Sequence, residues 1–369
     1  LGGSPIGIVN RFGDVPRALA VSPDGSEVYA AVFHSGNRTT TLEADIRNGG
    51  LEKPPPFVSA DSQPQPRTGL IVKFDGEHWR DDGDPTTGVE GKIWDDRVRF
   101  TLPDQDVFAI DANATPPVQS AATSGVGTTL FNMVVNPRSG KLYVSNTEAR
   151  NQVRFEGPGS NSTTVRGHFV ESRITVVTRN AVTPRHLNKH ITSYDQPLGS
   201  NSEKRRSLAT PLEMVVSEDG TTLYVAAFGS GRVGVFGTAA LENDSFSPNA
   251  GSQIPVTGGG PAGLLLDTQR QRLYVATRFD NGLSTIDLAS GREIAHVTLP
   301  NPEPASLVAG RPFLYDARLT SSRGDSSCAG CHIFGDLDQL AWDLGNPDEV
   351  RVASPNTYNN NGGGGWKSG

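Results

Sequence analysis

The strongest constraint on the fold is a recurring pattern of two short apolar segments separated by a polar turn, with a tyrosine early in the second segment. Clear copies lie at residues 16–32, 130–146, 211–227 and 261–277, and a degenerate fifth copy lies at 304–315. The tyrosines of the last three copies are spaced by 50 and 41 residues. This interval predicts several neighbouring copies of one small unit, because a single copy cannot bury its own apolar face.

The turns inside the copies predict β-hairpins. Gly25, Gly140 and Gly220 close these turns, and glycine readily adopts the left-handed backbone that a tight hairpin needs. Further strand-like segments follow the better copies, at residues 232–236, 283–288 and 293–299. Four short antiparallel strands per repeat are typical of a β-propeller blade. We therefore predict an all-β chain that forms a β-propeller of six or seven blades, with seven preferred.

Segments outside the clear copies contribute to this count. Residues 69–74 and 106–111 have the alternation of strands, and we expect them to form parts of one additional blade. Residues 173–178 are expected to complete the second copy, and the degenerate copy at 304–315 is expected to form a hairpin like the others.

Three of the copies carry a common local sequence: Tyr143-Val-Ser-Asn, Tyr224-Val-Ala-Ala and Tyr274-Val-Ala-Thr. This repeat resembles the bacterial and archaeal Y-V-T-N family of propellers, and the resemblance covers residues 6–317. It implies a propeller fold. It implies little about function, because propellers serve as scaffolds for many unrelated sites.

The motif with the clearest chemistry is Cys328-Ala-Gly-Cys331-His332, which contains the only two cysteines of the chain. The spacing C-x-x-C-H is the signature of covalent c-type haem attachment, with the histidine as the proximal ligand of the iron. A zinc site would need two more ligands at close spacing, and a thioredoxin-like pair would need a βαβ setting. We therefore predict one covalent haem c at Cys328, Cys331 and His332.

The residues before this motif sharpen the prediction. Asp316, Arg318, Leu319, Thr320 and Ser327 match a pattern that precedes the first C-x-x-C-H of the bacterial di-haem cytochrome c peroxidase and MauG family, and the segment resembles that family over about 25 residues. Those peroxidases use two haems, and no second C-x-x-C-H occurs in this sequence. The resemblance therefore implies a haem segment but does not support peroxidase activity.

The sixth ligand of the iron is unknown from the sequence. No Met or His follows His332. Met133 and Met214 occupy first-strand positions of the repeat, where core packing is the favoured interpretation. His186 and His190 are interpreted as exposed loop residues, although either could reach the iron. His34, after the second strand of the first copy, is a further candidate, as is a ligand from a neighbouring subunit.

An acidic stretch follows the haem motif. Its apolar residues recur at helical spacing and predict a short helix against the haem, with Trp342 near the porphyrin edge: Leu337, Leu340, Ala341 and Leu344. A solvated helix face is the favoured role of the carboxylates, and a Ca²⁺ site is the alternative: Asp336, Asp338, Asp343 and Asp348.

The composition limits the setting. The net charge is −7 and the basic residues form no sustained patch, so nucleic acid is not expected as a partner. No apolar run is long enough to span a membrane. The absence of other cysteines fits export, and haem c is matured outside the cytoplasm, so a periplasmic or extracellular location is expected. The predicted domains are a propeller at 1–317, a haem-binding segment at 318–350 and a flexible tail at 351–369.

The favoured function is an extracytoplasmic c-type cytochrome, in which the propeller carries one haem for electron transfer to redox partner proteins or further haem subunits of a larger assembly. One alternative is a peroxidase-like haem enzyme fragment that lacks its second haem domain. Another is a surface or assembly propeller in which the haem is secondary. The spin state of the iron separates the first two, because an enzyme keeps an open iron position.

Overall fold

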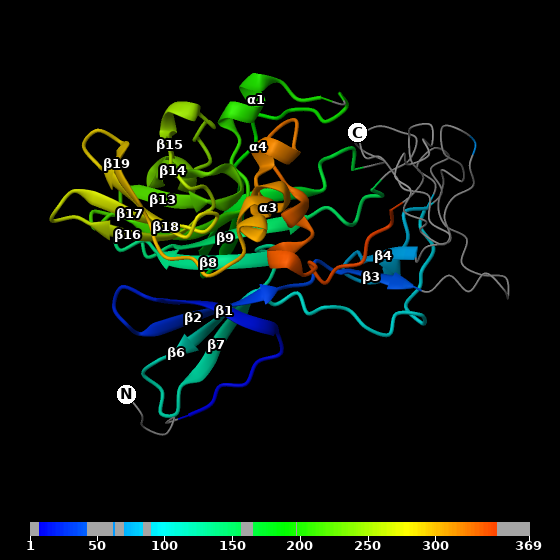
Figure 1. Cartoon of the computed structure of the whole chain (residues 1–369). Coiled ribbons are helices and arrows are strands. Elements are labelled where there is room, and N and C mark those ends of the chain that lie inside the picture. Colours follow the sequence, from blue (N-terminus) through cyan, green and yellow to red (C-terminus); the bar gives the residue numbers. More distant parts are fainter. Residues whose placement is uncertain are drawn as a thin grey trace.

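The computed structural model describes residues 7–42, 62, 70–83, 90–155, 165–196 and 198–344. These residues are mostly β, and all the sheets that they form are antiparallel (Figure 1). The predicted tail at 351–369 lies outside the described residues. No helix in the described part of the chain combines the length and the hydrophobicity that a membrane span requires.

Sixteen of the strands form four units of four strands each. The first unit contains β1 (Asp14–Val21), β2 (Glu27–His34), β6 (Val107–Asp111) and β7 (Val118–Thr123). The second contains β8 (Thr129–Val135), β9 (Leu142–Ala149), β10 (Val170–Thr178) and β11 (Ala181–His186). The third contains β12 (Pro211–Val216), β13 (Thr222–Ala227), β14 (Arg232–Gly237) and β15 (Gln253–Pro255). The fourth contains β16 (Pro261–Asp267), β17 (Arg272–Thr277), β18 (Gly282–Asp287) and β19 (Arg292–Thr298).

The four units are neighbours through their first strands, since β1 contacts β8, β8 contacts β12 and β12 contacts β16. A single bridge between His34 and Thr129 links the first two units into one eight-stranded sheet. Apolar side chains fill the spaces between successive units, and the alternation of each strand supplies one buried face to each space. Met133 and Met214 are 5% and 3% exposed in these cores, which confirms their packing role.

Two local predictions are corrected by the structure, and a third is confirmed. The strands predicted at 69–74 and 106–111 do not share a blade. The second of them, β6, pairs with β2, whereas β4 (Leu70–Phe74) forms a separate sheet with β3 (Thr39–Leu42) and β5 (Trp79–Arg80). The degenerate copy at 304–315 is the helix α3 (Ala305–Tyr315), because it lacks the longer polar turn that separates the two apolar segments in the other copies. Residues 173–178 do complete the second unit, as β10.

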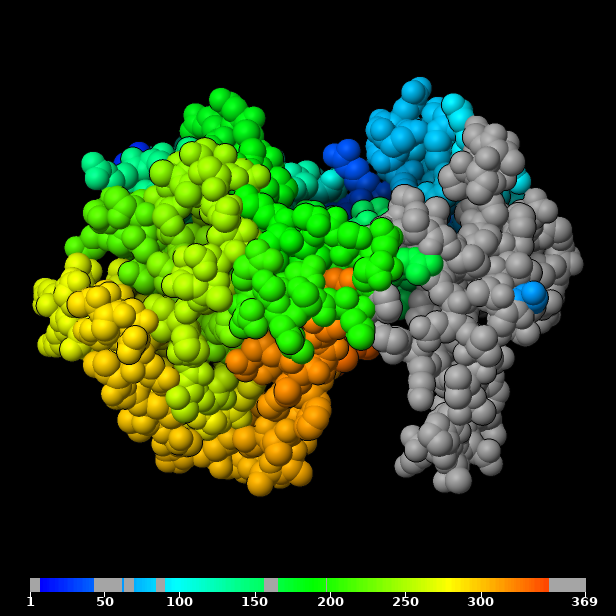
Figure 2. Space-filling view, turned by 90° about the horizontal axis from the view of Figure 1, so that it is seen from above, coloured from blue at the N-terminus to red at the C-terminus, as the bar shows by residue number. Residues whose placement is uncertain are grey.

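Short helices complete the fold. They are α1 (Asn201–Arg206), α2 (Thr238–Glu242), α4 (Ala317–Thr320) and the 3₁₀ turns η2 (Phe228–Ser230), η3 (Ala250–Ser252), η4 (Cys328–Gly330) and η5 (Ile333–Gly335). In Figure 1, α3 and α4 lie beside the third unit. Figure 2 shows the orange C-terminal residues packed against the green and yellow units. This position brings the haem motif to the repeated sheets.

Candidate haem-attachment site

The approach to the motif is held by a helix cap. Asp316 begins α4 by accepting a hydrogen bond from the amide of Arg318 at 2.9 Å. The guanidinium of Arg318 then donates to both carboxylate oxygens of Asp316, at 3.0 and 2.7 Å. The Asp316 side chain is 8% exposed, so this bidentate pair neutralises a buried charge. Asp316 and Arg318, two residues of the pattern that precedes the motif, therefore fix the backbone conformation at the start of α4.

The motif itself is one tight turn. The amide of Gly330 donates to the carbonyl of Ser327 at 2.8 Å, and the amide of His332 donates to the carbonyl of Cys328 at 3.0 Å. Cys328 and His332 are exposed, Cys331 is partly exposed, and Ala329 between them is 2% exposed. The turn thus presents one thiol and one imidazole to solvent and holds the second thiol against the protein.

Gly330 is required by a close approach to the second unit. A Cβ atom at this position would lie 2.7 Å from Val170 Cγ1 and 2.8 Å from Phe169 Cε2. The small second spacer of the motif therefore allows the turn to lie directly on the start of β10.

The residues after the motif are anchored in a group of aromatic rings, here called the phenylalanine cluster: Phe33, Phe131, Phe228 and Phe279. Ile333 is 2% exposed and packs into this cluster. Phe334 stacks on Phe33, with ring centroids 5.9 Å apart and an interplanar angle of 9°.

The cluster collects residues from all four units. Phe33, Phe228 and Phe279 each follow the repeat tyrosine of their unit by four or five residues, and Phe131 lies in β8 of the second unit. This set was not predicted from the sequence. The recurrence of Phe after the tyrosine was the signal that could have revealed it.

The second thiol lies in a less polar environment than the first. Burial is the main reason that the pKa of Cys331 rises to about 12, and the nearby Asp338 and Cys328 raise it further. Asp338 is itself 3% exposed, and burial raises its pKa. Hydrogen bonds to Asp338 from the Trp342 indole, at 2.9 Å, and the Leu340 amide, at 3.1 Å, oppose that shift.

The predicted helix over 337–344 does not form. Asp338 accepts the Leu340 amide with its side chain, and Gln339 has a left-handed backbone with φ of 60°. Both features compete with a helix, because they occupy or redirect the backbone groups that a helix would pair. Trp342 packs edge-on against Phe155 instead, with centroids 6.0 Å apart.

The carboxylates of this stretch do not converge. Asp338 faces Trp342, and Asp343, 7% exposed, pairs with Arg154 at 3.4 Å. Asp336 is exposed, and Asp348 lies outside the described residues. Across the described ranges, no three His, Cys, Asp or Glu side chains form a group that could hold a metal ion.

The histidines proposed as iron ligands lie in different environments. His186 ends β11, and burial lowers its pKa to about 4; its ring stacks on His168 at 6.0 Å. His190 Nε2 pairs with the carbonyl of Glu203 at 3.0 Å. Both are partly buried, so the expectation of exposed loop histidines is wrong. The reason is that β11 pairs with β10 and the following turn packs beneath α1.

His34 is the most buried of the three candidate histidines, at 7% exposure. Its Nδ1 lies 2.9 Å from Asp14 Oδ2, and its Nε2 is buried without a hydrogen-bond partner among the described residues.

The donors present fit a covalent haem. Two thiols and an imidazole lie on one turn, and within the described residues the His332 side chain makes no hydrogen bond or ion pair that would have to be broken. Cys328 and Cys331 would form the thioether links, and His332 would be the proximal ligand. A buried imidazole nitrogen without a partner, on His34, adds an unused donor to the same part of the molecule.

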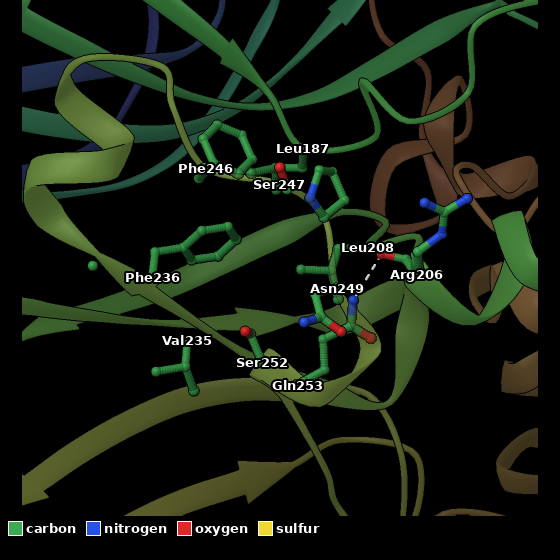
Figure 3. A pocket seen from close by; sticks show the side chains of 12 residues that line it. Leu187, Arg206, Leu208, Val235, Phe236, Phe246, Ser247, Asn249, Ser252 and Gln253 are labelled. Atoms are coloured by element: carbon green, nitrogen blue, oxygen red, sulfur yellow. Dashed lines mark hydrogen bonds between the residues drawn. The ribbon is translucent and has the colours of Figure 1, made fainter.

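A separate pocket lies between the second and third units (Figure 3). Its apolar wall is formed by Leu187, Leu208, Phe236 and Phe246, and its polar rim includes Arg206 and Gln253. Gln253 Nε2 donates to the carbonyl of Arg206 at 2.7 Å. None of its lining residues belongs to the haem motif or its flanks, so we do not assign it to that site.

Comparison with known proteins gives little beyond the architecture. No protein family and no curated protein matches the chain. Among solved structures, hydrazine synthase of Kuenenia stuttgartiensis is 16% identical with a TM-score of 0.39, covering 74% of this chain and 83% of that chain.

Two further structures show the same level of similarity. The periplasmic gluconolactonase PpgL of Pseudomonas aeruginosa is 13% identical with a TM-score of 0.39. The similarity covers 78% of this chain and 59% of that chain. The Cps50 (Swd1) β-propeller domain of Myceliophteria thermophila is 12% identical with a TM-score of 0.34, covering 78% of this chain and 75% of that chain. Similarities this weak support no conclusion about function.

Proposed function

We propose that this protein is an extracytoplasmic c-type cytochrome that carries one covalent haem for electron transfer. The observation that carries the proposal is the single turn that holds Cys328, Cys331 and His332, docked on the phenylalanine cluster through Ile333. When bound, the haem iron would supply one-electron chemistry, at a potential set by its axial ligands, its burial and nearby hydrogen bonds. The haem segment and its resemblance to di-haem peroxidases are part of this proposal.

The chain's own residues would position the group. The Asp316–Arg318 pair fixes the backbone before the turn, and Ile333 fixes it after the turn. Since neither anchor lies on the thiols or on His332, the Cys328 and His332 side chains stay exposed, and the partly buried Cys331 thiol lies beside them in the same turn. Exposure of Cys328 and His332 leaves this face accessible to a partner, and we propose redox proteins or further haem-bearing subunits as partners.

The scaffold in this proposal is a β-propeller of six or seven blades. Supporting it are four sequential four-stranded units that meet through their first strands, and the repeated tyrosine segments. Export to the periplasm or beyond is proposed with it, because covalent haem attachment takes place there and because the chain has no cysteines outside the motif.

The test is expression with export in a host that matures c-type cytochromes. Reduced-minus-oxidised spectra and the mass of the denatured protein should show one covalently bound haem per chain. A Cys328→Ser/Cys331→Ser variant should keep the scaffold's circular dichroism and lose the added mass. A colourless wild-type protein with two titratable thiols would overturn the proposal. High-spin iron that reacts rapidly with hydrogen peroxide would replace it with an enzymatic function.

A further inference from the structure

Of the two ring nitrogens of His34, one is hydrogen-bonded and the other has no hydrogen-bond partner among the described residues. It ends β2 and is directly opposite Asp14 of β1 in the strand register. The Asp14 carboxylate holds Nδ1 at 2.9 Å, whereas Nε2 is buried with no hydrogen-bond partner in the described part of the chain. A buried polar nitrogen that is left unpaired lowers the stability of the fold, so this arrangement needs a reason.

The arrangement matches that of a metal-bound histidine. Such histidines commonly donate the second ring nitrogen to a carboxylate, which fixes the tautomer and leaves the other nitrogen free for the metal. Here the fixed nitrogen is Nδ1, and the free nitrogen is Nε2. The side chain is 7% exposed, so Nε2 is directed into the protein rather than to solvent.

The position of His34 connects it to the haem motif. Its ring lies 4.4 Å from that of Phe33, and Phe33 stacks on Phe334, two residues after His332. The Arg17 guanidinium lies over both phenylalanines, 4.8 Å from Phe33 and 5.2 Å from Phe334. These ring contacts place His34 next to the residues that directly follow the motif.

The partly buried histidines of the described residues lack this combination. Both ring nitrogens of His296 have partners, Ser284 at 2.9 Å and Asp280 at 2.7 Å. His190 pairs through Nε2 with a backbone carbonyl, and its buried Nδ1 has no hydrogen-bond partner among the described residues. His168 Nε2 is also without a hydrogen bond there, but a carboxylate oxygen of Glu171 lies 3.2 Å from it. His34 alone among the described histidines has a carboxylate on Nδ1 and a fully buried, unpaired Nε2.

We propose that Nε2 of His34 is the second axial ligand of the haem iron, paired with His332, and that Asp14 is its positioning residue. This inference rests on the proposed function. It assigns the iron a bis-imidazole, six-coordinate state, which favours electron transfer over binding of an exogenous substrate. It also makes the first repeated unit, and not only the C-terminal segment, part of the haem site.

The experiment uses the full-length holoprotein. Mass spectrometry first establishes covalent haem in wild type and in His34→Gly. The wild-type spectrum should be low-spin, and His34→Gly should lose the low-spin signature and regain it when imidazole is added. His168→Gly, which removes a partly buried histidine from the stacked pair with His186, is the control and should leave the spectrum unchanged.

A second variant protects the test against misfolding. His34→Met keeps a side chain of similar length that can bind iron, and it should remain low-spin with a higher reduction potential, as expected for Met–His ligation. Asp14→Asn should leave the iron low-spin but shift its potential, because the ring loses its charged partner. A low-spin His34→Gly protein, or loss of the low-spin signature in His168→Gly, would overturn the inference while leaving the haem assignment intact. Absence of covalent haem in wild type would instead defeat the proposed function.

Discussion

The fourth unit, β16–β19, and the C-terminal segment at 316–344 are stabilised in different ways. In the fourth unit, each strand pairs with the next along the chain, and the buried residues are mostly apolar, such as Leu273, Val275 and Ile286. The C-terminal segment contains only short helical turns. Many of its buried side chains are polar or charged: Asp316, Arg323, Asp325, Ser326, Ser327, Asp338 and Asp343.

The partners of these two regions also differ in sequence distance. The hairpins of the fourth unit join residues a few positions apart, whereas Tyr194 donates to Asp325 across 131 residues and Asn151 donates to the carbonyl of Ala341 across 190 residues. The unit therefore has a fold that its own strands nearly specify. The segment that carries the haem motif has a conformation only because the units are already in place.

The largest expected effect tests whether buried polar groups contribute to the free energy of unfolding outside the C-terminal segment as well. Asp106, fully buried in the first unit, accepts hydrogen bonds from the amides of Val126 and Gly127, and burial raises its pKa to about 7. From about pH 4 to 7 the unfolded carboxyl ionises while the folded one keeps its proton, so the free energy of unfolding falls as pH rises through this window. The expected loss is roughly 4 kcal/mol.

The measurement is urea unfolding of wild type and Asp106→Asn at several pH values. The free energy of unfolding of wild type minus that of Asp106→Asn should fall by that amount from pH 4 to 7 and stay constant above pH 7. Burial also raises the pKa of Glu148 to about 7, so Glu148→Gln should give a second difference of the same sign. A difference for Asp106→Asn that does not change with pH would show that its carboxyl is ionised when folded.

The next test compares one apolar residue from each region. Leu273 of β17 is fully buried and Ile333 is 2% exposed. Leu273→Ala should lower the global free energy of unfolding by about 2–5 kcal/mol. Ile333→Ala should mainly release the C-terminal segment, so hydrogen exchange should speed up in residues 316–344 while amides of β16–β19 keep their protection. Equal loss of protection in both regions would mean that they unfold as one unit.

A smaller effect is expected from a single hydrogen bond. Tyr194→Phe removes the donor to the buried Asp325 carboxylate, at 2.9 Å, and leaves Ser321 as its other side-chain donor. The loss should be about 1.5–3 kcal/mol, because the acceptor is charged. Tyr29→Phe, whose hydroxyl donates to Glu27 at a partly exposed site, is the control and should cost less. Equal costs in chemical denaturation would argue against a special role for long-range polar contacts.

The smallest effect concerns the spacer of the haem motif. Gly330→Ala should destabilise the segment by about 1–3 kcal/mol, because its Cβ would meet Val170 and Phe169. Gly310→Ala, in α3 with nothing near its Cβ, should stabilise the protein by about 0.5–1 kcal/mol. Thermal denaturation of both variants gives the comparison, and a neutral Gly330→Ala would show that the turn is not held against β10.

Several elements of the fold could be predicted from the sequence. The tyrosine repeats located the paired first and second strands of each unit, and Gly25, Gly140 and Gly220 do adopt the left-handed backbone at 73°, 68° and 69°. Two predictions were wrong. The fifth copy forms a helix because it lacks the longer polar turn of the other copies, and residues 337–344 form no helix because Asp338 and Gln339 redirect the backbone. Apolar spacing alone did not distinguish these cases.

The sequence by itself determined the hairpins and the grouping of two thiols and an imidazole in one motif. These features depend on residues within a few positions of one another, so local chemistry suffices. Only the tertiary structure decided that Ile333 enters the phenylalanine cluster and that His34 keeps an unpaired nitrogen beside the motif. Those contacts join residues separated by most of the chain, and they exist only after the units have packed against one another.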